Sequence, residues 1–212
     1  MITVFANLKG GSGKSTVAFN LGIWLASHGV PVVAYDLDPQ RSLEDAARVR
    51  TEEGFAPPLE IYPPEENLEA GLTYHRGEVL VDVGASSMDA MRAALSVAGQ
   101  VVIPVPPGQA DVWATQRFLS MLGEVAYQGD PPRVQAFVNR ADTHHWVRES
   151  DETEEALASL EGLEVIPQRL AQRTAFRRSF SEGMGVSEFL KNSKAAGELD
   201  ALARALYPSV AE

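Results

Sequence analysis

A glycine-rich loop near the N-terminus combines the residue types that bind phosphate. The stretch NLKGGSGKST covers residues 7–16 and follows the short apolar run MITVFA. Glycines let backbone N–H groups converge on phosphate oxygens, and a following helix adds the partial positive charge of its N-terminus. Lys14 should reach the β- and γ-phosphates of a nucleotide, and the Ser15 hydroxyl should ligate Mg²⁺. The residues predicted to contact the nucleotide here are Gly10, Gly11, Ser12, Gly13, Lys14, Ser15 and Thr16.

The loop departs from the general phosphate-loop pattern at two positions. Leu8 stands where the pattern has its first glycine, and a second lysine, Lys9, precedes Lys14 by five residues. A glycine-rich turn without a ligand is the alternative, and for Lys9 the alternative is a solvated charge. The apolar run before the loop and the amphipathic segment after it, KSTVAFNLGIWLA, favour a true phosphate loop, because that motif joins a strand to a helix.

Three aspartates, Asp36, Asp38 and Asp82, end or follow apolar runs that predict strands. A carboxylate at the C-terminal end of a strand beside a phosphate loop is well placed to hold magnesium or water. Helix capping or turn formation is the alternative for each of them. No glutamate follows Asp82, although many motor ATPases carry their catalytic carboxylate there. We therefore expect slow turnover.

The elements that must position these residues alternate along the chain. Strands are predicted at 2–6, 31–36, 59–62, 78–82, 100–105, 133–138 and 163–166, and helices at 15–27, 42–50, 87–97, 110–126 and 152–160. This alternation predicts an α/β fold with a doubly wound, mostly parallel sheet and helices on both faces. No repeat or linker divides the chain, so we expect residues 1–212 to form a single domain.

Composition narrows the functional classes. The 212 residues are 45% hydrophobic, yet no apolar run approaches the roughly 20 residues that span a bilayer. The start of the chain lacks the basic region of a signal peptide. There are no cysteines, which excludes disulfides, thiolate chemistry and cysteine-ligated iron–sulfur clusters. These features favour a cytoplasmic protein.

The charge is unevenly distributed. A net charge of −11 argues against general attraction to DNA, but residues 166–194 hold six Lys/Arg against two Glu, a local charge of +4. Such a patch would bind phosphates without reading bases, with a steep dependence on salt. A solvated face with internal ion pairs is the alternative. The predicted DNA-binding residues are Arg169, Arg173, Arg177, Arg178, Lys191 and Lys194.

Ordered motifs over nearly the whole chain resemble those of the ParA/MinD family of deviant Walker A ATPases. KGGSGKST resembles the family's phosphate loop, VVAYDLDPQRS (32–42) its second motif and VLVDVGAS (79–86) its Walker B strand. VIPVPPGQADVWA (102–114) resembles the strand and loop that follow the Walker B strand, and residues 165–189 resemble the family's C-terminal segment. In size the chain is similar to the small ParA-type ATPases that lack an N-terminal helix-turn-helix domain, which implies a P-loop NTPase fold that binds ATP and Mg²⁺.

The resemblance also implies roles for individual residues. Lys9 would cross a dimer interface to phosphate oxygens bound by the other subunit. Asp36 and Asp82 would hold Mg²⁺ through waters, and Asp38 would orient or activate the attacking water. Asp111 would lie at the dimer interface, although a helix N-cap is equally plausible. The residues expected beside adenine are Asn139, Pro167 and Gln168.

The function implied is an ATP-dependent dimerisation switch that binds nonspecific double-stranded DNA of the nucleoid. It would position a cargo such as a plasmid, a chromosome origin, a carboxysome or a chemoreceptor cluster. A cargo-bound adaptor protein with a short basic segment would stimulate its slow ATP hydrolysis. We expect a cytoplasmic, nucleoid-associated protein.

Two alternatives remain open. A MinD-like membrane switch needs a basic amphipathic C-terminal helix, whereas GELDALARALYPSVAE has three acids and one arginine and predicts a packing helix, so we expect no stable membrane insertion. A P-loop ligase or kinase would show ATP turnover that depends on a small acceptor. His144, His145 and Trp146 are too few for a metal site and indicate a mobile loop or a partner contact.

Overall fold

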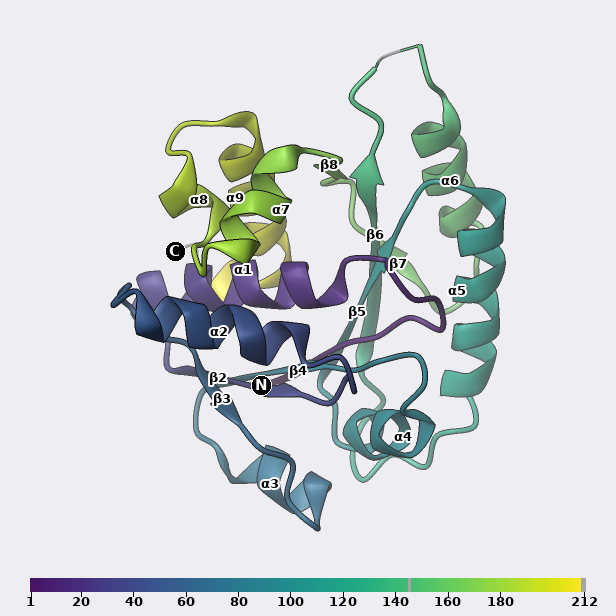
Figure 1. Ribbon diagram of the computed structural model, residues 1–212. Coiled ribbons are helices and arrows are strands. Elements are labelled where there is room, and N and C mark those ends of the chain that lie inside the picture. The colour runs from purple at the N-terminus through teal and green to yellow at the C-terminus, as the bar shows by residue number, and fades with distance from the viewer. Residues whose placement is uncertain (145, 211–212) are drawn as a thin grey trace.

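One sheet of eight strands organises the computed structural model, which describes residues 1–144 and 146–210 (Figure 1). The order is β3-β2-β4-β1-β5-β6-β7, and β8 pairs with β6. Every strand pairing in these ranges is parallel. The strands are β1 (Ile2–Phe5), β2 (Val32–Asp36), β3 (Glu60–Tyr62), β4 (Glu78–Asp82), β5 (Gln100–Val105), β6 (Arg133–Ala141), β7 (Glu164–Val165) and β8 (Leu170–Ala171).

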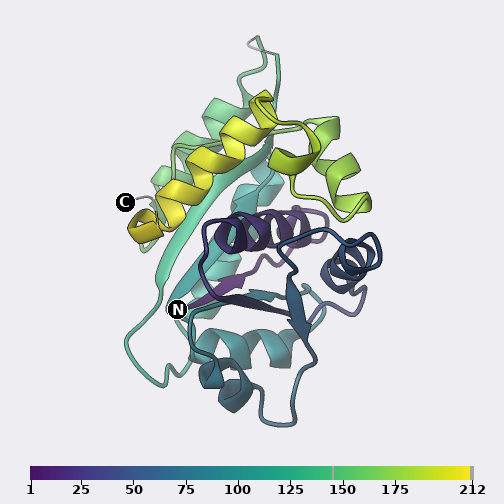
Figure 2. The same ribbon diagram turned by 90° about the vertical axis from the view of Figure 1, so that its left-hand side faces the viewer.

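Helices cover both faces of the sheet (Figure 2). Helices α1, α2, α7, α8 and α9 pack on one face, and α3, α4, α5 and α6 on the other. This arrangement confirms the predicted doubly wound α/β architecture. The helices are α1 (Lys14–Ser27), α2 (Ser42–Glu52), α3 (Leu68–Tyr74), α4 (Met88–Ser96), α5 (Gln109–Leu122), α6 (Glu149–Ala158), α7 (Thr174–Ser181), α8 (Val186–Phe189) and α9 (Lys194–Leu206), followed by a 3₁₀ turn at Pro208–Val210.

The central strands are apolar on both sides because each side meets a helical layer. In β1, Val4 packs with the α4 and α5 layer, whereas its neighbour Phe5 packs with the α1 and α9 layer. All six residues of β5 are buried. Period-2 side-chain alternation places consecutive residues in opposite cores, so both must be hydrophobic, and each large side chain contributes roughly 1.5–3 kcal/mol.

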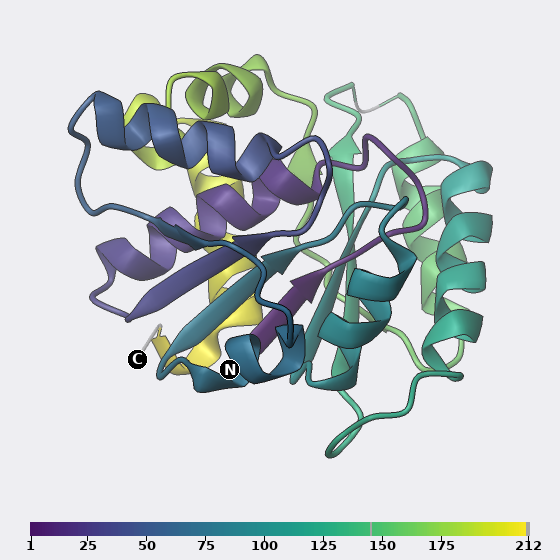
Figure 3. The same ribbon diagram turned by 60° about the horizontal axis from the view of Figure 1, so that its bottom comes forward.

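Parallel pairing brings the C-terminal ends of the central strands to a single edge. Asp36 at the end of β2 is in register with Asp82 at the end of β4, and Asp82 is in register with Phe5 at the end of β1. The loops that leave these strands therefore meet at one place (Figure 3). The glycine-rich loop follows β1, so it faces the aspartates of the two adjacent loops.

The predicted elements are present, with shifts of up to four residues at their ends. The strand predicted at 163–166 is shorter, at Glu164–Val165, and the helix predicted at 110–126 ends at Leu122. The elements α3, α7, α8 and β8 were not among the predicted ones. The predicted packing helix is α9, whose apolar face lies in the core through Leu199, Leu202 and Leu206. Among the described helices, none is long and apolar enough to cross a membrane.

Candidate nucleotide and switch site

The glycine-rich loop joins β1 to α1 and forms one wall of a cavity of about 360 Å³. Gly11 and Gly13 adopt positive φ angles of 77° and 92°, which suit glycine, and Gly13 is the N-cap of α1. A Cβ on Gly13 would stand 2.4 Å from the Nδ2 atom of Asn139, so a larger residue would collide there. The same cavity is also lined by Asp38 and Arg140 from other loops.

The polar residues of the loop gather at the start of α1. Lys14 is buried and Ser15 and Thr16 are half-buried, and all three line the cavity. Ser12 is buried, and its Oγ has no hydrogen-bond partner among the described residues. A buried hydroxyl without a partner is energetically costly, and Ser12 itself lines neither this cavity nor the neighbouring one that contains Asn139.

Asp82 is a buried carboxylate at the C-terminal end of β4. It is fully buried, and both of its carboxylate oxygens lack a hydrogen-bond partner within the described chain. Burial raises the pKa of Asp82 to about 7, which the nearby Ser15 hydroxyl and Lys14 ammonium oppose. An oxygen-rich site formed by Asp82, Ser15 and Asp36 suits Mg²⁺, which prefers such ligands.

Asp36 and Asp38 have different surroundings. The Asp36 carboxylate accepts hydrogen bonds from the backbone N–H groups of Asp38, at 3.1 Å, and Glu44, at 3.0 Å. It therefore caps the start of α2, and burial still raises its pKa above the ordinary value. The Asp38 carboxylate accepts a hydrogen bond from the Gln40 N–H at 3.0 Å. Asp38 lines the cavity beside the glycine-rich loop, which we call the phosphate-side cavity. A Cβ on Gly84 would stand 2.7 Å from this carboxylate, so Gly84 leaves room for it.

Lys9 is paired with a residue of another element. Its ammonium lies 2.6 Å from the Oδ2 atom of Asp111 in the first turn of α5. Lys9 is half-exposed, whereas Asp111 is buried. Lys9 lines neither the phosphate-side cavity nor the neighbouring cavity that contains Asn139. The alternative role of Asp111 as an N-cap is wrong, because the N-cap of α5 is Gly108.

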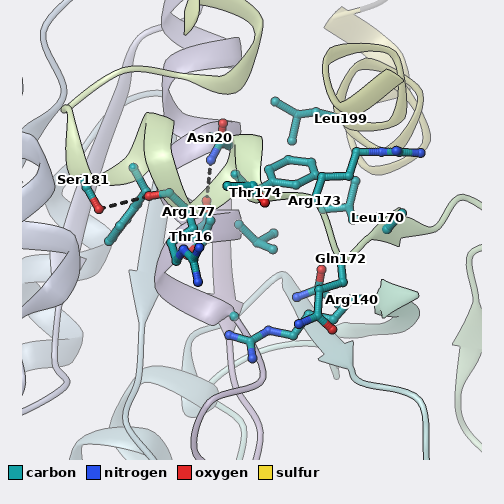
Figure 4. Close-up of a pocket in the computed structure, with 16 residues that line it drawn as sticks. Thr16, Asn20, Arg140, Leu170, Gln172, Arg173, Thr174, Arg177, Ser181 and Leu199 are labelled. Carbon is teal, nitrogen blue, oxygen red and sulfur yellow. Dashed lines mark hydrogen bonds between the residues drawn. The ribbon is translucent and has the colours of Figure 1, made fainter. Parts of the chain in front are cut away.

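A second cavity, of about 410 Å³, lies next to the first (Figure 4). It is bounded by α1, the end of β6, β8 and α7, and it contains Asn139. The Nδ2 atom of Asn139 donates to the Ser12 carbonyl at 2.7 Å and so ties β6 to the phosphate loop. The second cavity adjoins the phosphate-side cavity and is large enough for a nucleoside.

Two of the residues expected beside adenine, Pro167 and Gln168, lie outside the lining of this cavity. Its wall is formed instead by the segment from Leu170 to Thr174, including Gln172. The reason is that β8 pairs with β6 at Asn139, which brings this later segment beside the cavity. Sequence reasoning did not single out Gln172, although it lies in the segment 165–189, or Arg140, because the strand pairing that brings both to the cavity has no local sequence signal.

Two arginines of the predicted DNA patch are engaged inside the chain. The guanidinium of Arg169 lies 2.6 Å from carboxylates of Asp151 and Glu154 on α6. Arg173 forms a bidentate pair with Glu198 on α9, with its shortest contact at 2.5 Å. The local charge of +4 is therefore reduced by acids from other elements, as the alternative of internal pairing foresaw.

The other four cations of the patch are exposed: Arg177, Arg178, Lys191 and Lys194. Arg178 lies 3.7 Å from Glu182 and stacks 5.3 Å above the Phe189 ring. Arg177, Lys191 and Lys194 have no carboxylate within ion-pair distance in the described ranges. Arg177 also lines the nucleoside-sized cavity, so α7 borders that cavity and carries exposed cations.

In the loop after β6, the described residues His144 and Trp146 line neither cavity. His144 and Trp146 are exposed, Trp146 at 78%, and His145 lies outside the described residues. Among the residues that the structure describes, no three His, Cys, Asp or Glu side chains form a metal-binding group.

Comparison with known proteins agrees with this geometry. Residues 3–186 match the CobQ/CobB/MinD/ParA nucleotide binding domain. The chain is 29% identical over 212 residues to the maintenance of carboxysome distribution protein A of Halothiobacillus neapolitanus, covering 96% of this chain and 95% of that protein. It is 30% identical over 187 residues to the protein ParA of Rhizobium radiobacter, covering 86% and 83%. A Borrelia burgdorferi plasmid partition protein bound to AMPPNP shares the fold, with a TM-score of 0.75 over 98% of both chains at 17% identity.

Proposed function

Because the chain belongs to the CobQ/CobB/MinD/ParA family of nucleotide-binding proteins, we propose that it is an ATPase switch that positions a cargo. In this proposal, ATP binding allows two copies to pair, and the pair binds DNA without sequence preference. Hydrolysis then returns the chains to a state that does not bind DNA. The names of the Halothiobacillus neapolitanus relative and of the Borrelia burgdorferi structure suggest a carboxysome or a plasmid as the class of cargo.

The observation that carries the proposal is the position of Lys9. It lines neither cavity of its own chain and is held at an exposed face by Asp111. A half-exposed lysine in that position can exchange Asp111 for the phosphates of a second, similarly loaded chain. Its charge would then stabilise the pair only when triphosphate is present, which links nucleotide state to association.

Asp38 is the residue we assign to hydrolysis. Its carboxylate borders the phosphate-side cavity and is held by the Gln40 N–H, so it can orient a water toward the terminal phosphate. Asp82 and Ser15, with Asp36 behind them, would hold Mg²⁺. Magnesium, when bound, neutralises charge that develops on the phosphate oxygens. Lys14 would hold the β- and γ-phosphates directly.

Helix α7 is the element we assign to coupling nucleotide with DNA. Its residues Thr174, Phe176 and Phe180 border the nucleoside-sized cavity, while Arg178 faces outward. Arg178, Lys191 and Lys194, with Arg177 at the cavity rim, would contact DNA phosphates. One copy offers few cations on a chain of net charge −11, so pairing two copies would make binding effective.

The remaining parts of the proposal concern location and partners. A cargo-bound adaptor would accelerate hydrolysis, and the protein would associate with the nucleoid in the cytoplasm. A membrane role is disfavoured, because the apolar face of α9 is buried in the core through Leu199 and Leu202. Nothing in the cavities favours a second, small-molecule acceptor.

The test is sedimentation velocity of the protein with ATP, with ADP and without nucleotide. Wild type should sediment as a dimer with ATP and as a monomer with ADP. The Asp38→Ala variant should remain a dimer for longer, because ATP would persist. An identical sedimentation coefficient in all three states, in a protein that binds ATP, would refute the switch.

A further inference from the structure

The two cavities at the strand edge meet at a narrow junction. Four residues line both of them: Gly13, Thr16, Arg140 and Phe180. A nucleotide with its triphosphate in the first cavity and its nucleoside in the second must pass its α-phosphate through this junction. Of the residues that line both cavities in the described chain, Arg140 alone is charged.

A bulge in β6 aims Arg140 into the junction. Asn139 is in register with Leu170 and Ala141 with Ala171, so Arg140 is the extra residue between them. Its φ angle is 57°, in the left-handed region that a long L-residue rarely adopts. Bulges of this kind redirect side chains and are frequent beside functional sites. Strand β6 also cannot shift easily, because Asn139 is bonded to the Ser12 carbonyl.

The guanidinium of Arg140 lies over the phosphate loop. Its Nε is 3.9 Å from the point where a Cβ would stand on Gly13, so the missing side chain leaves room for it. In Figure 4 the Arg140 side chain is extended below Thr16 and Arg177. Thr16 belongs to the first turn of α1, whose N-terminus favours anions.

The other cations near the junction differ from Arg140: Arg177, although it has no carboxylate partner among the described residues, lines the nucleoside-sized cavity only. Lys14 is buried in the phosphate-side cavity, and Arg173 is paired with Glu198. Lys9 is paired with Asp111 outside both cavities. Arg140 is exposed and has no carboxylate within ion-pair distance among the described residues. Its fork of N–H donors is therefore available to an anion at the junction.

We propose that Arg140 binds the α-phosphate of the nucleotide from within the same chain. This inference rests on the proposed nucleotide site and names a residue of that site outside the recognised motifs. Because the α-phosphate is present in both ATP and ADP, Arg140 holds the nucleotide in both states of the switch. It thus secures nucleotide binding before pairing, whereas Lys9 acts only on pairing.

The test compares the affinities of wild type, Arg140→Ala and Arg140→Lys for ATP, ADP, AMP and adenosine, each by competition with a fluorescent ADP. Arg140→Ala should raise the Kd for ATP, ADP and AMP by a similar factor of about 10, as loss of a charge-assisted hydrogen bond predicts. Adenosine should be unaffected, and Arg140→Lys should restore part of the affinity. Arg76→Ala, which removes an exposed arginine after α3, is the matched control.

Each of the other possible outcomes would contradict a specific part of the proposal. Equal ATP affinity in wild type and Arg140→Ala overturns the role of Arg140 and leaves the ATPase proposal intact. A matching loss for adenosine would mean that Arg140 stacks on the base, and a loss confined to ATP would move it to the γ-phosphate; either overturns the α-phosphate assignment. Absence of nucleotide binding in folded wild type would refute the proposed function itself.

Discussion

The ammonium of Lys9 lies 2.6 Å from the Oδ2 atom of Asp111, and this pair joins the phosphate loop to the first turn of α5. The two residues are 102 positions apart in sequence. The contact keeps the lysine at the surface and away from the cavity that Lys14 lines. The two lysines of one loop thus have separate positions, and we assign them separate tasks.

Replacing Lys9 should separate nucleotide binding from pairing. We expect Lys9→Gln to bind ATP with nearly wild-type affinity, since Lys9 lines neither cavity, but to remain monomeric with ATP. Lys14→Gln is the contrasting variant, because it removes a cation from the phosphate-side cavity and should weaken ATP binding itself. Fluorescent-nucleotide titration and sedimentation measure the two properties. Loss of ATP affinity in Lys9→Gln would place this lysine in its own site and contradict the assignment.

Asp82 should make the magnesium-free protein less stable as the pH rises. Its carboxyl has a pKa of about 7 in the folded chain against an ordinary 3.8, so the folded state holds the proton more tightly. The free energy of unfolding therefore falls as the pH rises from about 4 to about 7. Asp82→Asn stays neutral, and its stability advantage over wild type should grow by roughly 2 kcal/mol between pH 5 and pH 8.

Urea unfolding in EDTA at the two pH values measures this effect. Asp89→Asn, at an exposed acid in the first turn of α4, is the control and should show no such trend. An Asp82→Asn advantage that does not change with pH would contradict the raised pKa. Added Mg²⁺ should stabilise wild type more than Asp82→Asn.

A buried ion pair should hold α2 against α8 and the turn that precedes it. Arg50 is fully buried, donates to both carboxylate oxygens of Glu188 at 2.8 and 2.9 Å, and also donates to the Gly183 carbonyl. Removing one partner leaves a desolvated charge, so Glu188→Gln should lower the free energy of unfolding by about 3 kcal/mol. Arg48→Ala, in an exposed pair of the same helix, should change the free energy of unfolding far less, because solvent screens that pair. Equal effects of the two variants in urea unfolding would be inconsistent with this account.

The cations of residues 166–194 should fall into two groups, those that bind DNA and those that form ion pairs within the chain. Arg178→Ala and Lys194→Ala should each weaken DNA binding by the ATP-bound protein and reduce the salt dependence, because both residues are exposed. Arg169→Ala should leave DNA binding nearly unchanged and lower the melting temperature, because Arg169 is paired with Asp151 and Glu154. Filter binding at several salt concentrations distinguishes the groups. If Arg169→Ala weakened DNA binding as much as Arg178→Ala, the division would be wrong.

Structural features that depend on neighbouring residues could be predicted from the sequence. The loop between β1 and α1 was predictable, because Gly11 and Gly13 must adopt positive φ and Lys14 begins the helix. The all-buried strand β5 was predictable from its continuous apolar run. Short elements such as α8, with four residues, carry too little periodicity to be recognised.

Long-range pairing explains what was missed. Arg173 looks like a surface cation in sequence, and only the packing of α9 brings Glu198 to it from 25 residues away. Gln172 was missed because the pairing of β8 with β6 determines which residues border the cavity. Arg140 owes its position to a bulge that has no signature in the residues around it.

The most direct test of the central claim is binding of purified wild type to mixed-sequence duplex DNA with ATP, with ADP and without nucleotide, at two salt concentrations. The account predicts tight binding with ATP alone, weakened strongly at the higher salt and abolished in Lys9→Gln. Equal binding, or equal absence of binding, in all three nucleotide states of a protein that binds ATP would contradict it.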